Sequence, residues 1–266
     1  MIYCCPKCKE ELVDSDNGYK CINNHQYDRA KEGYVNLVLV NQKNSKLPGD
    51  SKESLISRKN FLDKGYYKPL SDKLNEIVGN LVNEASTILD AGCGTGYYLG
   101  NLMNKVKCNF YAVDIGKEAV RITSKANKQA KCAVCSVFHL PVHDKSVDVS
   151  LSVFCPYSAE EFARVTKDKG YVISVTPGKK HLYEMKEIVY ESPYENEEQG
   201  YTLPEFELID STKVVSTITI NNEDIESLWR MTPYFHKTSV EATQRLFNCD
   251  TITTTIDFLV NIYKKK

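Results

Sequence analysis

The chain has 266 residues, of which 42% are hydrophobic, and its formal net charge is −1. This length can bury a large core beside a smaller module without disulfides, and the near-zero charge argues against a uniformly basic surface for nucleic acid. No stretch approaches the ~18 apolar residues of a membrane span and no charged-then-apolar leader opens the chain, so we expect a reduced, cytoplasmic protein with no membrane partner.

Potential metal ligands open the chain. Cys5-Pro-Lys-Cys8 is followed by Cys21-Ile-Asn-Asn-His25. Three thiolates and one imidazole make a closed tetrahedral set, which is typical of structural zinc and not of metal catalysis. Cys4 offers a rival pairing with Cys8, but Cys5 gives the tighter and commoner spacing. The spacing therefore predicts a small zinc-binding domain over residues 1–40.

A polar connector over residues 41–69 follows, and it contains a helix. Asp50 or Ser51 can cap this helix, Gly65 ends it, and a second helix starts near Pro69. Residues 1–70 hold twelve Lys and Arg against nine Asp and Glu, whereas 191–226 hold ten acidic residues against one lysine. Any phosphate-facing surface is therefore expected in the N-terminal third, although such charges can simply be solvated.

From residue 86, short apolar runs alternate with amphipathic ones. This alternation predicts βα units and a mostly parallel sheet within a domain covering residues 70–266. We expect strands at 87–91, 108–114, 131–135, 147–153 and 170–176, and helices at 96–105, 117–127, 158–167 and 179–190. The C-terminal sequence predicts a strand at 214–220, helices at 222–230 and 237–247, and a strand rich in β-branched residues at 251–263. We expect one of these two strands to close the sheet by antiparallel pairing.

A glycine-rich loop, Asp90-Ala-Gly92-Cys-Gly94-Thr95-Gly96, lies between a buried strand and a helix. Its glycines let the backbone approach a ligand closely, and the amides at the helix start favour polar or anionic groups. Asp114 ends the next strand and can accept both ribose hydroxyls. The spacing departs from the Gly-x-Gly-x-x-Gly of dehydrogenases, which stay the alternative, and resembles the first motif of S-adenosylmethionine-dependent methyltransferases.

Two later segments point to the same edge of the sheet. Cys135 to Pro141 resembles the segment that borders the adenine in this superfamily. Phe154-Cys-Pro-Tyr157 leaves the fourth strand at the carboxyl edge, where open α/β sheets bind ligands. Phe154 and Tyr157 could stack on a flipped base there, or they could simply pack against the following helix.

The two modules together resemble the RlmA family of large-subunit ribosomal RNA guanine-N1 methyltransferases, nearly end to end. Besides the cysteines and the glycine loop, the matching segments are Ala30 to Leu37, Pro48 to Ser51, Arg58 to Asp63, Gly65 to Tyr67, Ala163 to Val165 and Thr176 to Leu182. The resemblance implies a Rossmann-like class I S-adenosylmethionine-dependent methyltransferase sheet with a small N-terminal zinc-binding domain. It also implies a 23S ribosomal RNA hairpin as partner, and a homodimer.

The resemblance assigns residues as well. Cys5, Cys8, Cys21 and His25 match the family's zinc ligands, and Tyr67, Thr95-Gly96 and His181 match its cofactor contacts. Without the family, Tyr67 could simply anchor the linker helix and His181 could be an ordinary surface residue.

Methyl transfer to guanine N1 requires an unpaired base and a group that accepts the N1 proton. Candidates for the acceptor are His139, Asp144, Asp148 and His181, and no spacing singles one of them out. Phe154 or Tyr157 is expected to hold the base, while Asp90 and Asp114 are committed to the cofactor. We expect the zinc-binding domain to present basic side chains to RNA phosphates. We also expect residues 70–266 alone to bind the cofactor.

Two other functions fit the same motifs. One is a methyltransferase that acts on a small molecule or a protein, with the zinc-binding domain recruiting that substrate. The other is a non-catalytic zinc-binding interaction protein. The intact Asp90, loop glycines and Asp114 argue against the second, and the short connector that contributes Tyr67 argues against the first. Family members act near the macrolide site and differ over neighbouring guanines, so the target base and any tylosin-type resistance stay open.

Overall fold

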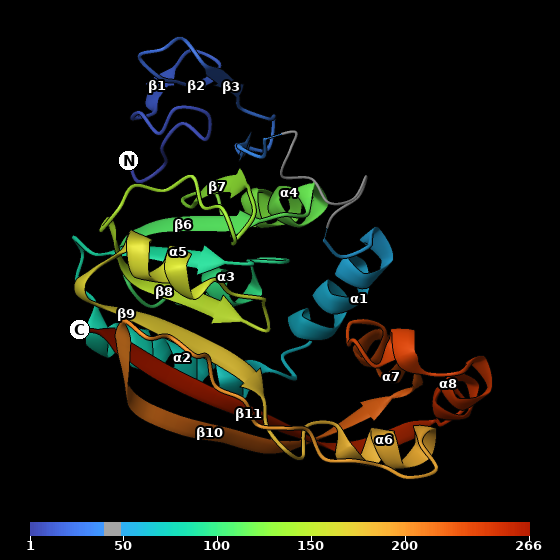
Figure 1. Cartoon of the computed structure of the whole chain (residues 1–266). Helices are drawn as coiled ribbons and strands as arrows, with labels where there is room; N and C mark the ends of the chain where they lie inside the picture. Colours follow the sequence, from blue (N-terminus) through green and yellow to red (C-terminus); the bar gives the residue numbers. More distant parts are fainter. Residues whose placement is uncertain (40–48) are drawn as a thin grey trace.

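The computed structural model describes residues 1–39 and 49–266, and it contains one small and one large sheet (Figure 1). The small sheet is antiparallel and belongs to the N-terminal module, with β1 (Val13–Ser15), β2 (Gly18–Lys20) and β3 (Gln26–Asp28) in chain order. Figure 1 shows this module, in blue, at one end of the molecule, and the C-terminal helices, in orange and red, at the other.

The large sheet carries the rest of the chain. Its strands are β4 (Val35–Asn36), β5 (Thr87–Ala91), β6 (Asn109–Asp114), β7 (Lys131–Val134), β8 (Val147–Val153), β9 (Thr166–Pro177), β10 (Phe206–Asn221) and β11 (Thr251–Lys265). The helices are α1 (Lys52–Asp63), α2 (Lys68–Leu81), α3 (Tyr97–Met103), α4 (Lys117–Ala126), α5 (Ala159–Val165), α6 (Tyr183–Val189), α7 (Asn222–Arg230) and α8 (Val240–Phe247), with a short 3₁₀ turn at Phe235–Lys237.

The strand order is β10-β11-β9-β8-β5-β6-β7-β4. The strands from β4 to β9 pair in parallel, and β11 runs antiparallel between β9 and β10. The chain order reverses at β5, which lies between β6 and β8. An open sheet binds its ligand at such a switch point, beyond the carboxyl ends of the strands, and the glycine loop begins there. The predicted sheet, with its antiparallel closing strand, is confirmed.

Two hydrophobic cores lie on opposite faces of the large sheet. One contains buried side chains of α1, α2, α3 and the C-terminal helices, including Phe61, Leu99 and Trp229. The other joins the sheet to the N-terminal module through residues such as Tyr3 and Leu37. The module is therefore packed against the large sheet through a shared core and is not a tethered accessory.

The N-terminal module is joined to the large domain by backbone as well as by side chains. Tyr3 pairs with Val142 in an isolated bridge, and Val35 of β4 pairs in parallel with Ala133 of β7. The fully buried Tyr3 hydroxyl donates to the Lys131 carbonyl over 2.7 Å. The predicted boundary at residues 40 and 41 lies outside the described residues and stays a prediction.

Helix α1 is positioned by both of its ends. The Ser51 hydroxyl accepts a hydrogen bond from the Ser54 amide, as in an N-cap, whereas Asp50 pairs with Arg58. At the other end, Lys64 Nζ lies 2.5 Å from Asp224 Oδ1, and the Tyr66 hydroxyl donates to Asp224 Oδ2. This contact fixes α1 against α7, so that α1 closes one side of the region above the glycine loop.

The main departure from the predicted elements is the length of β10. We expected a strand at 214–220, but β10 begins at Phe206 and pairs with β11 along its whole length. The first half escaped prediction because it lies at the sheet edge with nearly every side chain exposed, so no alternation of burial marks it. None of the helices in the described ranges is long and apolar enough to cross a membrane.

Candidate active site and metal centre

The four predicted metal ligands meet in the N-terminal module. Their donor atoms all lie within 4.8 Å of one another. The Sγ atoms of Cys5, Cys8 and Cys21 are 3.4, 3.4 and 3.3 Å from His25 Nδ1, and Cys8 Sγ is 3.7 Å from Cys21 Sγ. A tetrahedron with Zn–S bonds of about 2.3 Å separates its sulfur atoms by about 3.8 Å, so the donor set fits zinc.

The surroundings of this cluster support a structural role. The Tyr27 hydroxyl lies 3.0 Å from Cys5 Sγ, as an outer partner of a metal-bound thiolate would. Cys4 is buried outside the cluster, and its amide donates to the Pro141 carbonyl. Of the two possible pairings with Cys8, the geometry therefore favours Cys5.

A cavity of about 730 Å³ opens at the carboxyl edge of the large sheet. Its size falls within the usual ~300–1,000 Å³ of small-molecule sites. Most of the predicted cofactor residues line it, namely Tyr67, Asp90, Gly92, Gly94, Thr95, Asp114 and His181, whereas Gly96 lies just behind, at the start of α3. Residues without a predicted cofactor role line it too, among them Asp50, Arg58, Phe138, Tyr201 and Tyr234.

The glycine loop has the close packing that its sequence requires. Gly92 has φ +81°, and a Cβ there would lie 2.1 Å from Cys155 Sγ. Gly96 has φ +75°, and a Cβ there would lie 2.5 Å from Asn127 Nδ2. Both positions need the left-handed backbone and the missing side chain that only glycine supplies. The loop is thus packed closely against Cys155 and Asn127, while Gly92, Gly94 and Thr95 line the cavity.

Asp90 and Asp114 form the acidic floor of the cavity. Asp114 Oδ2 accepts from the Gly94 amide over 3.0 Å, and Oδ1 accepts from the Gly116 amide over 2.8 Å. These bonds fix the carboxylate and leave one lone pair on each oxygen for ribose hydroxyls. Burial, followed by the nearby charge of Asp114, raises the pKa of Asp90 to about 7.

This raised pKa makes cofactor binding dependent on pH. S-adenosylmethionine carries a net positive charge, so it favours ionised Asp90. With a pKa of about 7, roughly a tenth of the carboxyl groups are ionised at pH 6 and nine tenths at pH 8. We expect the affinity to fall by up to ~tenfold from pH 8 to pH 6, measured by calorimetry. Asp90→Asn should bind weakly and lose this fall toward pH 6; an equally steep fall in that variant would contradict this origin.

Tyr67 and His181 form a buried pair on the cavity wall. His181 Nδ1 accepts from the Asp257 amide over 3.2 Å, so its proton is on Nε2, which lies 3.3 Å from the Tyr67 hydroxyl. Burial, together with the charge of Lys186, lowers the pKa of His181 to about 3. His181 is therefore neutral, and both of its ring nitrogens are already engaged, which argues against it as the proton acceptor. It orients Tyr67, whose hydroxyl hydrogen is free to point to a ligand.

The two aromatic candidates after β8 differ in their surroundings. Phe154 lines the cavity, is 42% exposed and has φ +53°. Such a conformation strains a bulky residue, and strained residues concentrate at functional sites. Tyr157 lies outside the cavity lining and stacks on Tyr201 at 3.7 Å between ring centroids. The geometry favours Phe154 as the candidate that stacks on a base, and the contact with Tyr201 argues against Tyr157.

Two of the proton-acceptor candidates lie at the wrong edge of the sheet. Asp148, near the start of β8, accepts from the Thr87 amide at the start of β5 over 2.8 Å. Asp144 precedes β8 and pairs with Arg164 at 2.7 Å. The amino ends of parallel strands face away from the switch point, so the geometry argues against both residues as proton acceptors. His139 is exposed next to Phe138, outside the cavity lining, and stays a prediction.

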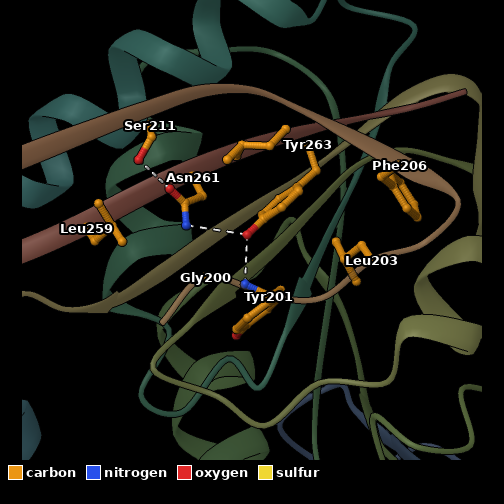
Figure 2. A pocket seen from close by; sticks show the side chains of 9 residues that line it. Gly200, Tyr201, Leu203, Phe206, Ser211, Leu259, Asn261 and Tyr263 are labelled. Carbon is orange, nitrogen blue, oxygen red and sulfur yellow. Dashed lines mark hydrogen bonds between the residues drawn. The ribbon is translucent and has the colours of Figure 1, made fainter. Parts of the chain in front are cut away.

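A second hollow lies between β10, β11 and the loop before β10 (Figure 2). Its polar floor is already hydrogen-bonded: Ser211 donates to Asn261 over 2.7 Å, and the Tyr201 amide donates to the Tyr263 hydroxyl over 2.7 Å. Its described lining contains no charged side chain. The bond to Tyr263 holds Tyr201, which also lines the larger cavity, against β11.

Two protein families match this chain in their characteristic segments. The family described as RlmA, N-terminal, matches residues 3–46, and a methyltransferase domain matches residues 89–174. These ranges contain the metal cluster and the glycine loop. Together with the strand order, they define a class I S-adenosylmethionine-dependent methyltransferase that carries a structural zinc site.

Curated relatives extend the match over most of the chain. The 23S rRNA (guanine(748)-N(1))-methyltransferase of Streptomyces fradiae is 28% identical, over 91% of this chain and 89% of its own. Putative 23S rRNA (guanine-N(1)-)-methyltransferases of Micromonospora griseorubida and Bacillus subtilis are 32% and 33% identical, over 68% and 70% of this chain and 67% and 68% of theirs. The chain belongs to the RlmA family of 23S rRNA guanine-N1 methyltransferases.

Proposed function

We propose that this protein transfers a methyl group from S-adenosylmethionine to N1 of one guanine in a hairpin of 23S ribosomal RNA. The relatives named above support the substrate class. The observation that carries the proposal is the strained Phe154, which places an aromatic ring in the same cavity as the cofactor residues. Base–aromatic stacking contributes about 1–3 kcal/mol per base, enough to hold a flipped guanine beside the methyl donor.

The N-terminal module gives the RNA a surface beside the cavity. Segment 141–143, which pairs with residues 2–4 of the module, continues directly from Phe138 on the cavity lining. Lys7, Lys9 and Lys31 are exposed on the module, whereas Arg29 is paired with Asp14. RNA backbone held by these lysines would reach the cavity through the surface over segment 136–143.

Two finer parts of the proposal follow from the resemblance. A homodimer would supply the basic surface that one nearly neutral chain lacks. The Streptomyces fradiae relative is named for guanine 748, and we propose the same guanine or a neighbour as the target, with a change in tylosin-type macrolide susceptibility. Light scattering and drug susceptibility of a deletion strain test these two points.

The role of Phe154 is tested by substitution. Phe154→Leu keeps an apolar side chain and loses the aromatic face, so the RNA methylation rate should fall by ~10–100-fold while S-adenosylmethionine affinity changes little. Tyr157→Phe, which keeps the stack on Tyr201, is the matched control and should retain the rate. Single-turnover transfer of a labelled methyl group measures both. An unchanged rate for Phe154→Leu, or labelling of metabolites in place of RNA, would count against the proposal.

A further inference from the structure

The charges that line the cofactor cavity are unbalanced. Among its described lining residues, Asp50, Asp90 and Asp114 are carboxylates, and Arg58 is the one side chain with a permanent positive charge. S-adenosylmethionine brings a sulfonium, an ammonium and a carboxylate into this cavity. Two cationic groups can meet the acidic residues, but a carboxylate buried among carboxylates is costly unless a cation pairs with it.

Arg58 lies where it can reach a ligand on the glycine loop. It projects from α1, and its Nη1 lies 3.5 Å from the position that a Cβ on Gly94 would take. Nη1 also pairs with Asp50, and Nη2 lies 3.5 Å from the Met231 carbonyl. The side chain is 26% exposed, so the guanidinium is partly shielded from water, and a charge-assisted hydrogen bond there is stronger than on an open surface.

The backbone around Arg58 is fixed independently of the ion pair. Gly49, with φ +88°, packs so closely on the loop after β6 that a Cβ there would lie 2.8 Å from the Gly116 Cα. Asp50 and the Ser51 cap of α1 follow directly. Gly49 thereby holds the start of α1 beside the loop after β6, and Arg58, about two turns further along α1, lies next to Gly94.

We propose that Arg58 binds the carboxylate of the methionine moiety of S-adenosylmethionine. The guanidinium keeps five N–H donors, and it can hold Asp50 on one edge and present another edge to the ligand. Asp50 orients Arg58 and does not itself contact the carboxylate. Cofactor binding would therefore depend on α1, which lies outside the predicted methyltransferase domain of residues 70–266.

Two ligands that differ in one group test this proposal. S-adenosylmethionine and its decarboxylated analogue share the adenosine, the sulfonium and the ammonium. Calorimetry on the full chain should give Arg58→Gln a ~10–100-fold weaker affinity for S-adenosylmethionine and an affinity for the analogue within about threefold of wild type. Arg58→Lys keeps the positive charge but loses the planar pair of N–H donors, so its affinity for S-adenosylmethionine should lie between those of wild type and Arg58→Gln.

The control and the contrary outcomes are equally specific. Arg121→Gln removes a cation from α4 that pairs with Glu118 outside the cavity lining, and it should leave both affinities unchanged. An equal loss for both ligands in Arg58→Gln would mean that Arg58 only supports the fold. No loss for S-adenosylmethionine would place its carboxylate elsewhere, and weaker RNA binding in that case would assign Arg58 to the substrate.

Discussion

Cys5→Ser should lose zinc and destabilise the whole protein, not the N-terminal module alone. Structural zinc contributes about 10–16 kcal/mol, which is comparable with the total stability of a domain, about 5–15 kcal/mol. The cysteines hold a module whose buried Tyr3 and Leu37 share a core with Leu89 of β5 and Val113 of β6. We expect less than one zinc per chain by metal analysis, a melting temperature lower by more than ~10 °C, and weaker S-adenosylmethionine binding.

Cys4→Ser is the matched control for this prediction. It removes a buried thiol from the adjacent position, but Cys4 lies outside the metal cluster. One zinc per chain should remain, with a loss of stability of about 1–2 kcal/mol. Zinc retained by Cys5→Ser and lost by Cys4→Ser would show that the rival pairing of Cys4 with Cys8 is the real one.

Gly92→Ala should abolish useful cofactor binding. The added Cβ would lie 2.1 Å from Cys155 Sγ and 2.7 Å from Cys155 Cβ, so the loop or the segment after β8 must move. The left-handed backbone costs a further ~1–2 kcal/mol for alanine. We expect S-adenosylmethionine affinity to fall by ~100-fold or more in calorimetry, while far-UV circular dichroism stays close to wild type.

Gly79→Ala is the matched control, because it makes the same substitution where a Cβ meets no close neighbour. Gly79 lies in α2, and a Cβ there would be 3.7 Å from Val106, an ordinary contact. Alanine is the better helix former, so the free energy of unfolding should rise by ~0.5–1 kcal/mol and cofactor affinity should not change. Equal affinities in Gly92→Ala and Gly79→Ala would contradict the role given to the glycine loop.

The sequence predicted the metal site and the cofactor loop, because residues close together in the chain form most of each. The spacing of Cys5, Cys8, Cys21 and His25 predicted a tetrahedral donor set, and those atoms meet. The three loop glycines and Asp114 predicted a cofactor loop, and they lie at the switch point of the sheet. Asp148 could have been placed correctly as well, because a residue near the start of a parallel strand lies at the far edge from the ligand.

Other features depend on contacts between distant segments, which no local pattern carries. Arg58 looks like any surface arginine on a helix until α1 is placed over Gly94. By sequence, Tyr157 and Phe154 are equal candidates for stacking on the base, and the stack of Tyr157 on Tyr201 is what distinguishes them. The expectation that residues 70–266 bind the cofactor alone ignored Arg58 and Tyr67, which line the cavity from outside that range. The contacts argue against that expectation.

The most direct test of the central claim is the chemical identity of the methylated nucleoside. Large-subunit RNA from a strain that lacks this protein would be incubated with the full chain and S-adenosylmethionine, digested, and analysed by mass spectrometry with reverse-transcription mapping. We predict N1-methylguanosine at one hairpin guanine, with a reverse-transcription stop there because methylation blocks the base-pairing edge. Methylation at another atom of guanine, or RNA that stays unmodified while another acceptor is labelled, would contradict the account.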